Sequence, residues 1–265
     1  QIGDYRLADC TPALIAEQRD QLLRTPTLRG PATKPATVVR YLAVLSHAFT
    51  VAMKEWGWVE DNPVQRVTKP KEPRGRVRFL SDDERERLLA ACRVSSNRHL
   101  YPVVVLALST GMRAGEVMGL TWDRVDLDRG SMLLEQTKNG ERRVVPIVGH
   151  AAEVVRLQAK IRRLDTGLLF PAAKTQGDGT VRPADLRVPW LKAVEQADIK
   201  GFRFHDLRHS AASYMLMNGA SIAELAEVLG HKTLQMVKRY SHLSESHTRG
   251  IVERMNAAVF GGLGA

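Results

Sequence analysis

Residues 203–214 read R-F-H-D-L-R-H-S-A-A-S-Y, and the organisation of the whole chain can be built outward from this stretch. At the period of an α-helix, His205, Arg208 and His209 fall on one face, whereas the apolar Leu207 falls on the opposite face. The sequence therefore predicts a helix that is anchored by an apolar stripe and presents imidazole and guanidinium groups together.

A zinc site is the alternative interpretation of His205 and His209, because histidines four residues apart on a helix can share a metal ion. No Glu lies between them as it does in zinc protease motifs, and the intervening Arg208 would repel a cation. We therefore expect no metal ligands in this helix.

The segment that follows predicts two further helices. Ser221 and Glu224 form a capping box, and Gly230 ends the first helix with His231 on the turn. The second, short helix carries Tyr240. On these residues alone, a helix-turn-helix that reads DNA is a fair alternative, and a single Tyr in this setting is usually a half-buried packing residue.

Upstream of this stretch, the chain predicts helices interrupted by one β-hairpin. A capping box starts a helix at Ser81, an apolar helix is broken at Gly111, and another helix is predicted over residues 113–120. Strands are predicted over residues 131–137 and 142–147, because the Asn-Gly pair between them favours a tight hairpin turn. The fold class is therefore mainly α with a small antiparallel β-sheet.

Residues 1–66 predict a separate helical module. Thr11-Pro12 begins one helix, and a second helix begins near Thr37 with an apolar stripe and a basic exterior. The side chains of this module that we expect to contact DNA are Arg40, His47 and Lys54.

Residues 67–78 predict a basic interdomain linker, because Pro70 and Pro73 forbid regular structure. Its cationic side chains are Lys69, Lys71, Arg74, Arg76 and Arg78. A solvated linker whose charge only favours solubility is the alternative, but between two basic domains we favour one that follows a phosphate backbone. The second domain is then predicted over residues 79–265, with a C-terminal tail from about residue 244.

The net charge of +10 indicates a polyanionic partner, with nucleic acid as the leading class and an anionic membrane surface second. The most apolar run, residues 103–108, is too short to span a membrane. Cys10 and Cys92 are far apart, which is typical of core thiols in a reduced protein. Because the sequence starts with Gln1 and not Met, we expect it to be part of a longer protein.

Four short boxes, in order along the chain, together resemble the signature of tyrosine recombinases of the phage-integrase type. The boxes are G-M-R-A-G-E (111–116), H-D-L-R-H (205–209), L-G-H (229–231) and K-R-Y-S-H (238–242), with Lys138 at a hairpin turn between the first two. Residues 37–64 are similar to the core-binding domain of this family, and we expect a preceding helix of that domain to be absent from this sequence. The resemblance implies a helical core-binding domain followed by an α+β catalytic domain.

The resemblance also implies the residues that carry the chemistry. The implied catalytic set is Arg113, Lys138, His205, Arg208, His231 and Tyr240, with Glu116, Asp206 and His209 in supporting positions. The residue types fit phosphoryl transfer, because two guanidinium groups can bind the non-bridging oxygens of a phosphodiester without a metal ion.

Within this set, Tyr240 is the expected nucleophile, and its ordinary pKa of about 10 requires a nearby proton acceptor. His205 is the better candidate for that base, His231 for a hydrogen bond to the phosphate, and Lys138 for the general acid. The implied activity is site-specific cleavage and rejoining of DNA through a 3′-phosphotyrosyl intermediate, with no metal, ATP or other cofactor.

The partners implied by the resemblance are double-stranded DNA with core-type attachment sites and a homo-tetramer assembled on DNA through the C-terminal tail. A DNA-bending accessory protein and an excision factor are also expected, no membrane is expected, and the implied location is the cytoplasm of a bacterial host of a phage or mobile element. A topoisomerase of type IB is the alternative enzyme, and a helix-turn-helix regulator is the alternative binding protein. The regulator leaves Arg113 and Lys138 without a role.

Overall fold

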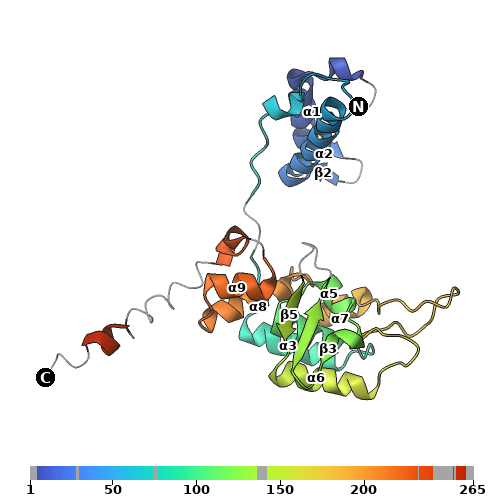
Figure 1. Cartoon of the computed structure of the whole chain (residues 1–265), viewed down its shortest axis with the longest axis vertical. Coiled ribbons are helices and arrows are strands. Elements are labelled where there is room, and N and C mark those ends of the chain that lie inside the picture. The colour runs from blue at the N-terminus through green and yellow to red at the C-terminus, as the bar shows by residue number, and fades with distance from the viewer. Residues whose placement is uncertain are drawn as a thin grey trace. The chain divides into compact units, whose positions relative to one another are not determined.

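The computed structural model describes residues 5–27, 30–73, 77–135, 142–231, 233–240, 253 and 255–260. The chain divides into two compact units, Gln1–Arg76 and Val77–Ala265, and each is described by itself (Figure 1). Helices dominate the described residues, with two small antiparallel sheets, which confirms the predicted fold class.

The first unit is built on two helices, α1 (Pro12–Arg24) and α2 (Pro35–Lys54). The Thr11 side chain caps α1 as predicted, since its hydroxyl accepts a hydrogen bond from the backbone N–H of Leu14 at 3.2 Å. Smaller elements complete the unit, namely the 3-10 turns η2 (Leu7–Asp9) and η3 (Pro63–Arg66) and the hairpin β1 (Pro26–Thr27) and β2 (Gly30–Ala32). The hairpin was not predicted, because strands of two and three residues are too short to show alternation.

The core of the first unit lies between the facing stripes of α1 and α2. Its buried side chains include Ile15, Val38, Leu42 and Phe49, so the predicted apolar stripe of the second helix is confirmed. By length and composition, α2 is also the one described helix that could cross a membrane, a test that core helices of soluble proteins pass as well.

The second unit is organised around the helix α4 (Leu100–Thr110), which is apolar on all sides and therefore buried. It contacts α3 (Asp82–Arg93), α6 (Gly149–Lys160) and α8 (Asp206–Met217). Further helical elements are α5 (Ala114–Met118), η4 (Trp122–Arg124), α7 (Arg187–Gln196), α9 (Ile222–Leu229) and η5 (Leu234–Met236), and residues 255–260 are also helical.

One antiparallel sheet lies beside these helices, with strand order β3 (Val125–Asp126), β4 (Ser131–Leu134) and β5 (Arg143–Pro146). The β4–β5 hairpin is the predicted one, with shorter strands, and Met132 pairs with Val145 on its buried face. The predicted Asn-Gly turn lies outside the described residues. The strand β3 was not predicted, because two residues show no period.

Two helices differ from the predictions in ways that matter for the site. The helix α5 is shorter than the helix predicted over residues 113–120. Arg113 lies just before it, as the N-cap residue. After α9, the predicted second helix is replaced by two 3-10 turns, η5 and residues 238–240, and Tyr240 lies in the second of them.

Candidate active site

The helix α8 is buried over residues 206–213, and it contacts both α4 and α9. Arg208 and His209, which were predicted to lie together on one face of this helix, are only 4% and 8% exposed. Their side chains lie among packed helices, because α8 is central to the unit. His205, at the N-cap of α8, is exposed.

Arg208, on α8, links the C-terminal ends of α4 and α9. Its Nη1 donates a hydrogen bond to the carbonyl of Gly111 at 2.7 Å, and its Nη2 donates to the carbonyl of Leu229 at 2.7 Å. Both carbonyls lie at helix C-termini, where backbone acceptors lack helical partners and the helix dipole favours a cation. Burial lowers the pKa of Arg208 to about 10, with a further contribution from the charge of Arg113, so the group remains a cation at neutral pH.

Gly111 allows this close meeting of helix ends. Its φ of +64° is the left-handed conformation that favours glycine, and a Cβ there would lie 2.4 Å from Cδ2 of Leu229. Any larger residue at position 111 would push α4 and α9 apart, and would disturb the two carbonyls that hold Arg208.

His231 follows α9 and completes the surroundings of Arg208. Its Nε2 lies 2.8 Å from Nη2 of Arg208. Since guanidinium only donates, Nε2 accepts and Nδ1 carries the proton. Burial and then the charge of Arg208 lower the pKa of His231 to about 4, which keeps the ring neutral at pH 7. Nδ1 is buried and has no hydrogen-bond partner among the described residues.

Tyr240 is almost fully buried, with 2% of its surface exposed. Its hydroxyl is hydrogen-bonded to Nδ1 of His209. Burial raises the pKa of Tyr240, and burial together with the charge of His205 lowers the pKa of His209 to about 4. A neutral imidazole therefore faces a protonated phenol, and it can accept the phenolic proton.

His209, and not His205, is thus the histidine in contact with the expected nucleophile. The ring of His205 packs edge-on against that of His209, with centroids 5.3 Å apart. Helical spacing placed both histidines on one face, but it could not show which of them reaches a residue 31 positions further along the chain. The role of His205 as base stays a prediction.

Arg113 approaches the same site from the N-terminus of α5. Its Nη1 donates to Oε1 of Glu116 at 2.7 Å, and its backbone N–H donates to Oε2 at 2.9 Å. Glu116 is also paired with Arg143, whose Nη2 lies 2.9 Å from Oε2. Burial tends to raise the pKa of Glu116, but the hydrogen bonds from Arg113 and the charge of Arg143 outweigh burial and lower it.

Sequence reasoning did not single out Arg143. A signal was present, since Arg143 lies two residues before the buried Val145 on β5 and therefore shares the inward side of the strand. A cation at an inward strand position needs a charged partner, and Glu116 supplies it.

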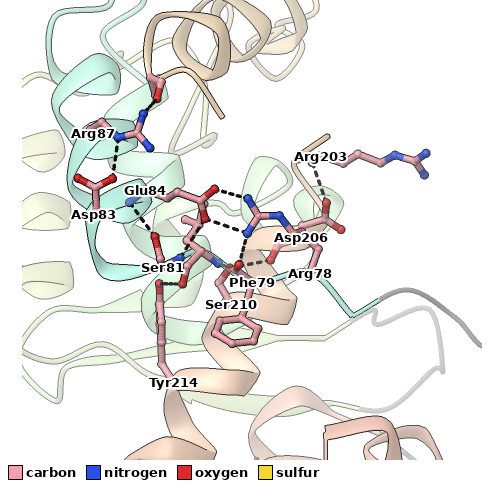
Figure 2. A network of polar contacts seen from close by, with 12 residues as sticks. Arg78, Phe79, Ser81, Asp83, Glu84, Arg87, Arg203, Asp206, Ser210 and Tyr214 are labelled. Carbon is pink, nitrogen blue, oxygen red and sulfur yellow. Dashed lines mark hydrogen bonds and ion pairs between the residues drawn. The ribbon is translucent and has the colours of Figure 1, made fainter. Parts of the chain in front are cut away.

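A second polar network holds the start of the second unit against α8 (Figure 2). The backbone N–H of Leu80 donates to Oγ of Ser210 at 3.0 Å, and the hydroxyl of Tyr214 donates to the carbonyl of Leu80 at 2.9 Å. Arg78 is paired with Glu84, with Nη1 to Oε2 at 2.8 Å. Arg78 was expected among the linker cations that follow DNA, but its guanidinium forms an ion pair with Glu84.

The remaining predicted residues have varied surroundings. Asp206 accepts a hydrogen bond from the backbone N–H of Arg203 at 2.8 Å, which supports a structural role (Figure 2). The exposed members of the predicted DNA-binding set are Arg40, His47, Lys54, Lys69 and Lys71. Lys138, Arg74, Arg76 and the tail residues 241–252 lie outside the described residues. Within the described part of the chain, no three His, Cys, Asp or Glu side chains cluster as a metal site.

Known proteins are similar to this chain in sequence and in fold. The phage integrase family matches residues 78–247. The chain is 34% identical over 239 residues to the shufflon-specific DNA recombinase of Escherichia coli, covering 89% of this chain and 58% of the relative. It is 31% identical over 241 residues to the integrase of Salmonella phage P22, covering 86% of this chain and 60% of the relative. The chain therefore spans less than two thirds of the length of either relative.

Among solved structures, the catalytic domain of bacteriophage HP1 integrase aligns with a TM-score of 0.52 and 31% identity, covering 69% of this chain and 98% of that domain. The family match contains Arg113, Arg208, His231 and Tyr240, the residues gathered by α8 and its neighbours. The chain belongs to the phage integrase family.

Proposed function

We propose that this chain is the core-binding and catalytic part of a site-specific DNA recombinase that acts through a 3′-phosphotyrosyl intermediate. The observation that carries the proposal is that the side chains of the expected catalytic set meet around α8. Arg208 is held beside a neutral His231, and the neighbouring His209 contacts the hydroxyl of Tyr240. The relatives named as an integrase and a DNA recombinase support the same activity.

The main obstacle to cleavage is the negative charge of the phosphodiester, which repels a nucleophile. The positive charge of the arginines would offset it. Arg113 and Arg208 would bind the two non-bridging oxygens, and the buried Nδ1–H of His231 would donate to one of them. These donors are already oriented by Glu116 and by two helix ends, so little reorganisation is needed in the transition state.

In the chemical step, the Oη of Tyr240 attacks phosphorus, an Oη–P bond forms and the bond from phosphorus to the 5′ oxygen breaks. The phenolic proton passes to a neutral imidazole, for which His205 and His209 are the candidates, and Lys138 protonates the leaving 5′ oxygen. The products are a 3′-phosphotyrosyl ester and a free 5′-hydroxyl. Attack by the 5′-hydroxyl of another strand reverses these steps, so neither ATP nor a metal ion is required.

The proposed partners follow from the same assignment. The substrate is double-stranded DNA with core-type sites, which the exposed cations of α2 and the linker would contact through phosphates. Four copies would assemble on DNA through their C-terminal tails, with a bending protein and an excision factor as further partners, in the cytoplasm of a bacterial host.

A suicide DNA substrate tests the proposal. A nick next to the cleavage site lets the short 5′-hydroxyl fragment diffuse away, so the protein stays covalently bound and survives denaturation. We expect such a complex for the unaltered chain and none for Tyr240→Phe, whereas Tyr101→Phe, a tyrosine elsewhere in the second unit, should react normally. A chain that binds the site specifically but never forms the adduct would be a regulator and not a recombinase.

A further inference from the structure

Arg143 of β5 lies in the candidate active site without being part of the expected catalytic set. We propose that Arg143 is a positioning residue, which orients Arg113 through their shared carboxylate Glu116 and supports the turn that carries His231 by packing on Gly230. The inference deepens the proposed function and rests on it.

The first observation is the geometry around Glu116. Arg143 presents its guanidinium edge to this carboxylate, with Nη2 at 2.9 Å from Oε2 and Nη1 at 3.4 Å from Oε1. The same carboxylate accepts from Nη1 of Arg113 at 2.7 Å. A two-point contact between a planar guanidinium and a carboxylate fixes direction as well as distance, which a single lysine contact cannot do.

The second observation is burial. The side chains of Arg143 and Glu116 are 11% and 7% exposed. Buried ion pairs of this kind add little to stability compared with apolar side chains of similar volume, because desolvation offsets their attraction. A role in orientation therefore explains the cluster better than a role in stability.

Arg143 also changes the net charge of the cluster around Glu116. Glu116 alone would neutralise Arg113 and weaken its hold on a phosphate. With Arg143 present, the cluster of Arg113, Arg143 and Arg208 sets three guanidinium groups against one carboxylate. The excess positive charge then remains available to the phosphodiester.

The third observation is the contact with Gly230, the residue between α9 and His231. A Cβ at Gly230 would lie 2.4 Å from Nη1 of Arg143 and 3.0 Å from its Cζ. The guanidinium therefore lies directly against this backbone, which has the left-handed φ of +65°. Leu229, just before the glycine, supplies a carbonyl to Arg208. Arg143 thus also supports the turn on which His231 and one contact of Arg208 depend.

The test measures the rate of covalent complex formation at saturating suicide DNA for the full chain. We expect Arg143→Gln to react about 10- to 100-fold more slowly, the loss typical of residues that orient reactive groups through others. Arg143→Lys should recover only part of the rate, because it restores charge without the planar fork. The control is Arg142→Gln, which removes the same charge from the neighbouring exposed position and should react at the normal rate.

A substrate with a methylphosphonate at the cleavage site separates positioning from a merely structural role. Replacing one non-bridging oxygen by methyl removes the phosphate charge, so the loss caused by Arg143→Gln should shrink to less than about 3-fold. Within a Glu116→Gln background, Arg143→Gln should add a smaller loss than it causes in the unaltered chain, because the orientation of Arg113 through the shared carboxylate is already gone and only the support of the Gly230 turn remains.

Three results would contradict either the role inferred for Arg143 or the proposed function on which it rests. Equal rates for Arg143→Gln and the unaltered chain would overturn it. Equal losses on both substrates, together with a lower Tm, would overturn it in favour of a structural role. If the unaltered chain itself forms no covalent complex, the proposed function fails first, and the comparison of variants is not reached.

Discussion

At the scale of single residues, the site depends on histidines that burial keeps neutral. His209 faces the hydroxyl of Tyr240, and His231 faces the guanidinium of Arg208. A protonated His209 could no longer accept the phenolic proton, and a protonated His231 would repel Arg208. The low pKa values of both rings are therefore what the proposed mechanism requires.

These values predict a loss of stability in acid. The pKa of His209 and of His231 is about 4 in the folded chain, because burial disfavours their charged forms, against about 6.5 in an unfolded chain. Between these values the unfolded state binds protons that the folded state does not, so protonation favours unfolding. The stability present above about pH 6.5 should fall towards pH 4, by up to about 1.4 kcal/mol per pH unit for each ring.

Urea unfolding at a series of pH values checks this expectation. His209→Asn should flatten the acid limb of the stability profile, whereas His150→Asn, which replaces an exposed histidine of the same unit, should leave it unchanged. If His209→Asn has the same acid limb as the unaltered chain, His209 is not the group responsible.

At the scale of elements, α8 connects the expected catalytic residues to the first residues of the second unit. Ser210 lies one turn after Asp206 on α8, and its hydroxyl oxygen accepts a hydrogen bond from the backbone N–H of the fully buried Leu80. The hydroxyl of Tyr214 donates to the carbonyl of Leu80 (Figure 2). The start of the second unit is therefore fastened to the helix that carries Arg208.

Two serines of α8 should respond differently to the same substitution. Ser210→Ala leaves the buried N–H of Leu80 without an acceptor, and should cost about 1–3 kcal/mol of unfolding free energy. Ser213→Ala removes a buried hydroxyl that has no partner among the described residues, so it should be neutral or slightly stabilising. Urea unfolding of both variants measures the difference, and equal costs would show that the Leu80 contact contributes little.

At the scale of the whole molecule, the chain carries a net charge of +10. Lys69 and Lys71, which belong to the predicted basic linker, are exposed. If both contact phosphates, Lys69→Gln with Lys71→Gln should reduce the slope of log affinity against log salt by about 2, since each phosphate contact contributes about 0.9. Lys160→Gln with Lys200→Gln removes the same charge at other exposed positions and serves as the control. An equal change of slope in both would reflect net charge and not contact.

The C-terminal tail carries a prediction about assembly. If the tail joins copies in the proposed tetramer, a chain that ends at Leu243 should bind a single core site normally but assemble poorly on paired sites. Native gel electrophoresis with the two DNA substrates distinguishes these steps. Unchanged tetramer formation would remove the tail from the assembly.

The sequence by itself determined the features that depend on neighbours along the chain. Helix starts at Thr11, Ser81 and Ser221 were predicted because a capping side chain bonds to backbone only two or three residues away. The hairpin of β4 and β5 was predicted from its turn and alternation, and the expected catalytic set was inferred from four boxes that resemble a known family, together with Lys138.

Only the tertiary structure decided which of these residues meet. Three contacts were not predicted: the hydrogen bond between His209 and Tyr240, the ion pairs of Glu116 with both Arg113 and Arg143, and the ion pair between Arg78 and Glu84. Two of the three join different elements, and local periodicity gives the direction of a side chain without naming its distant partner. The packing of α8 between α4 and α9 supplies those partners, because burial forces each polar group there to find one.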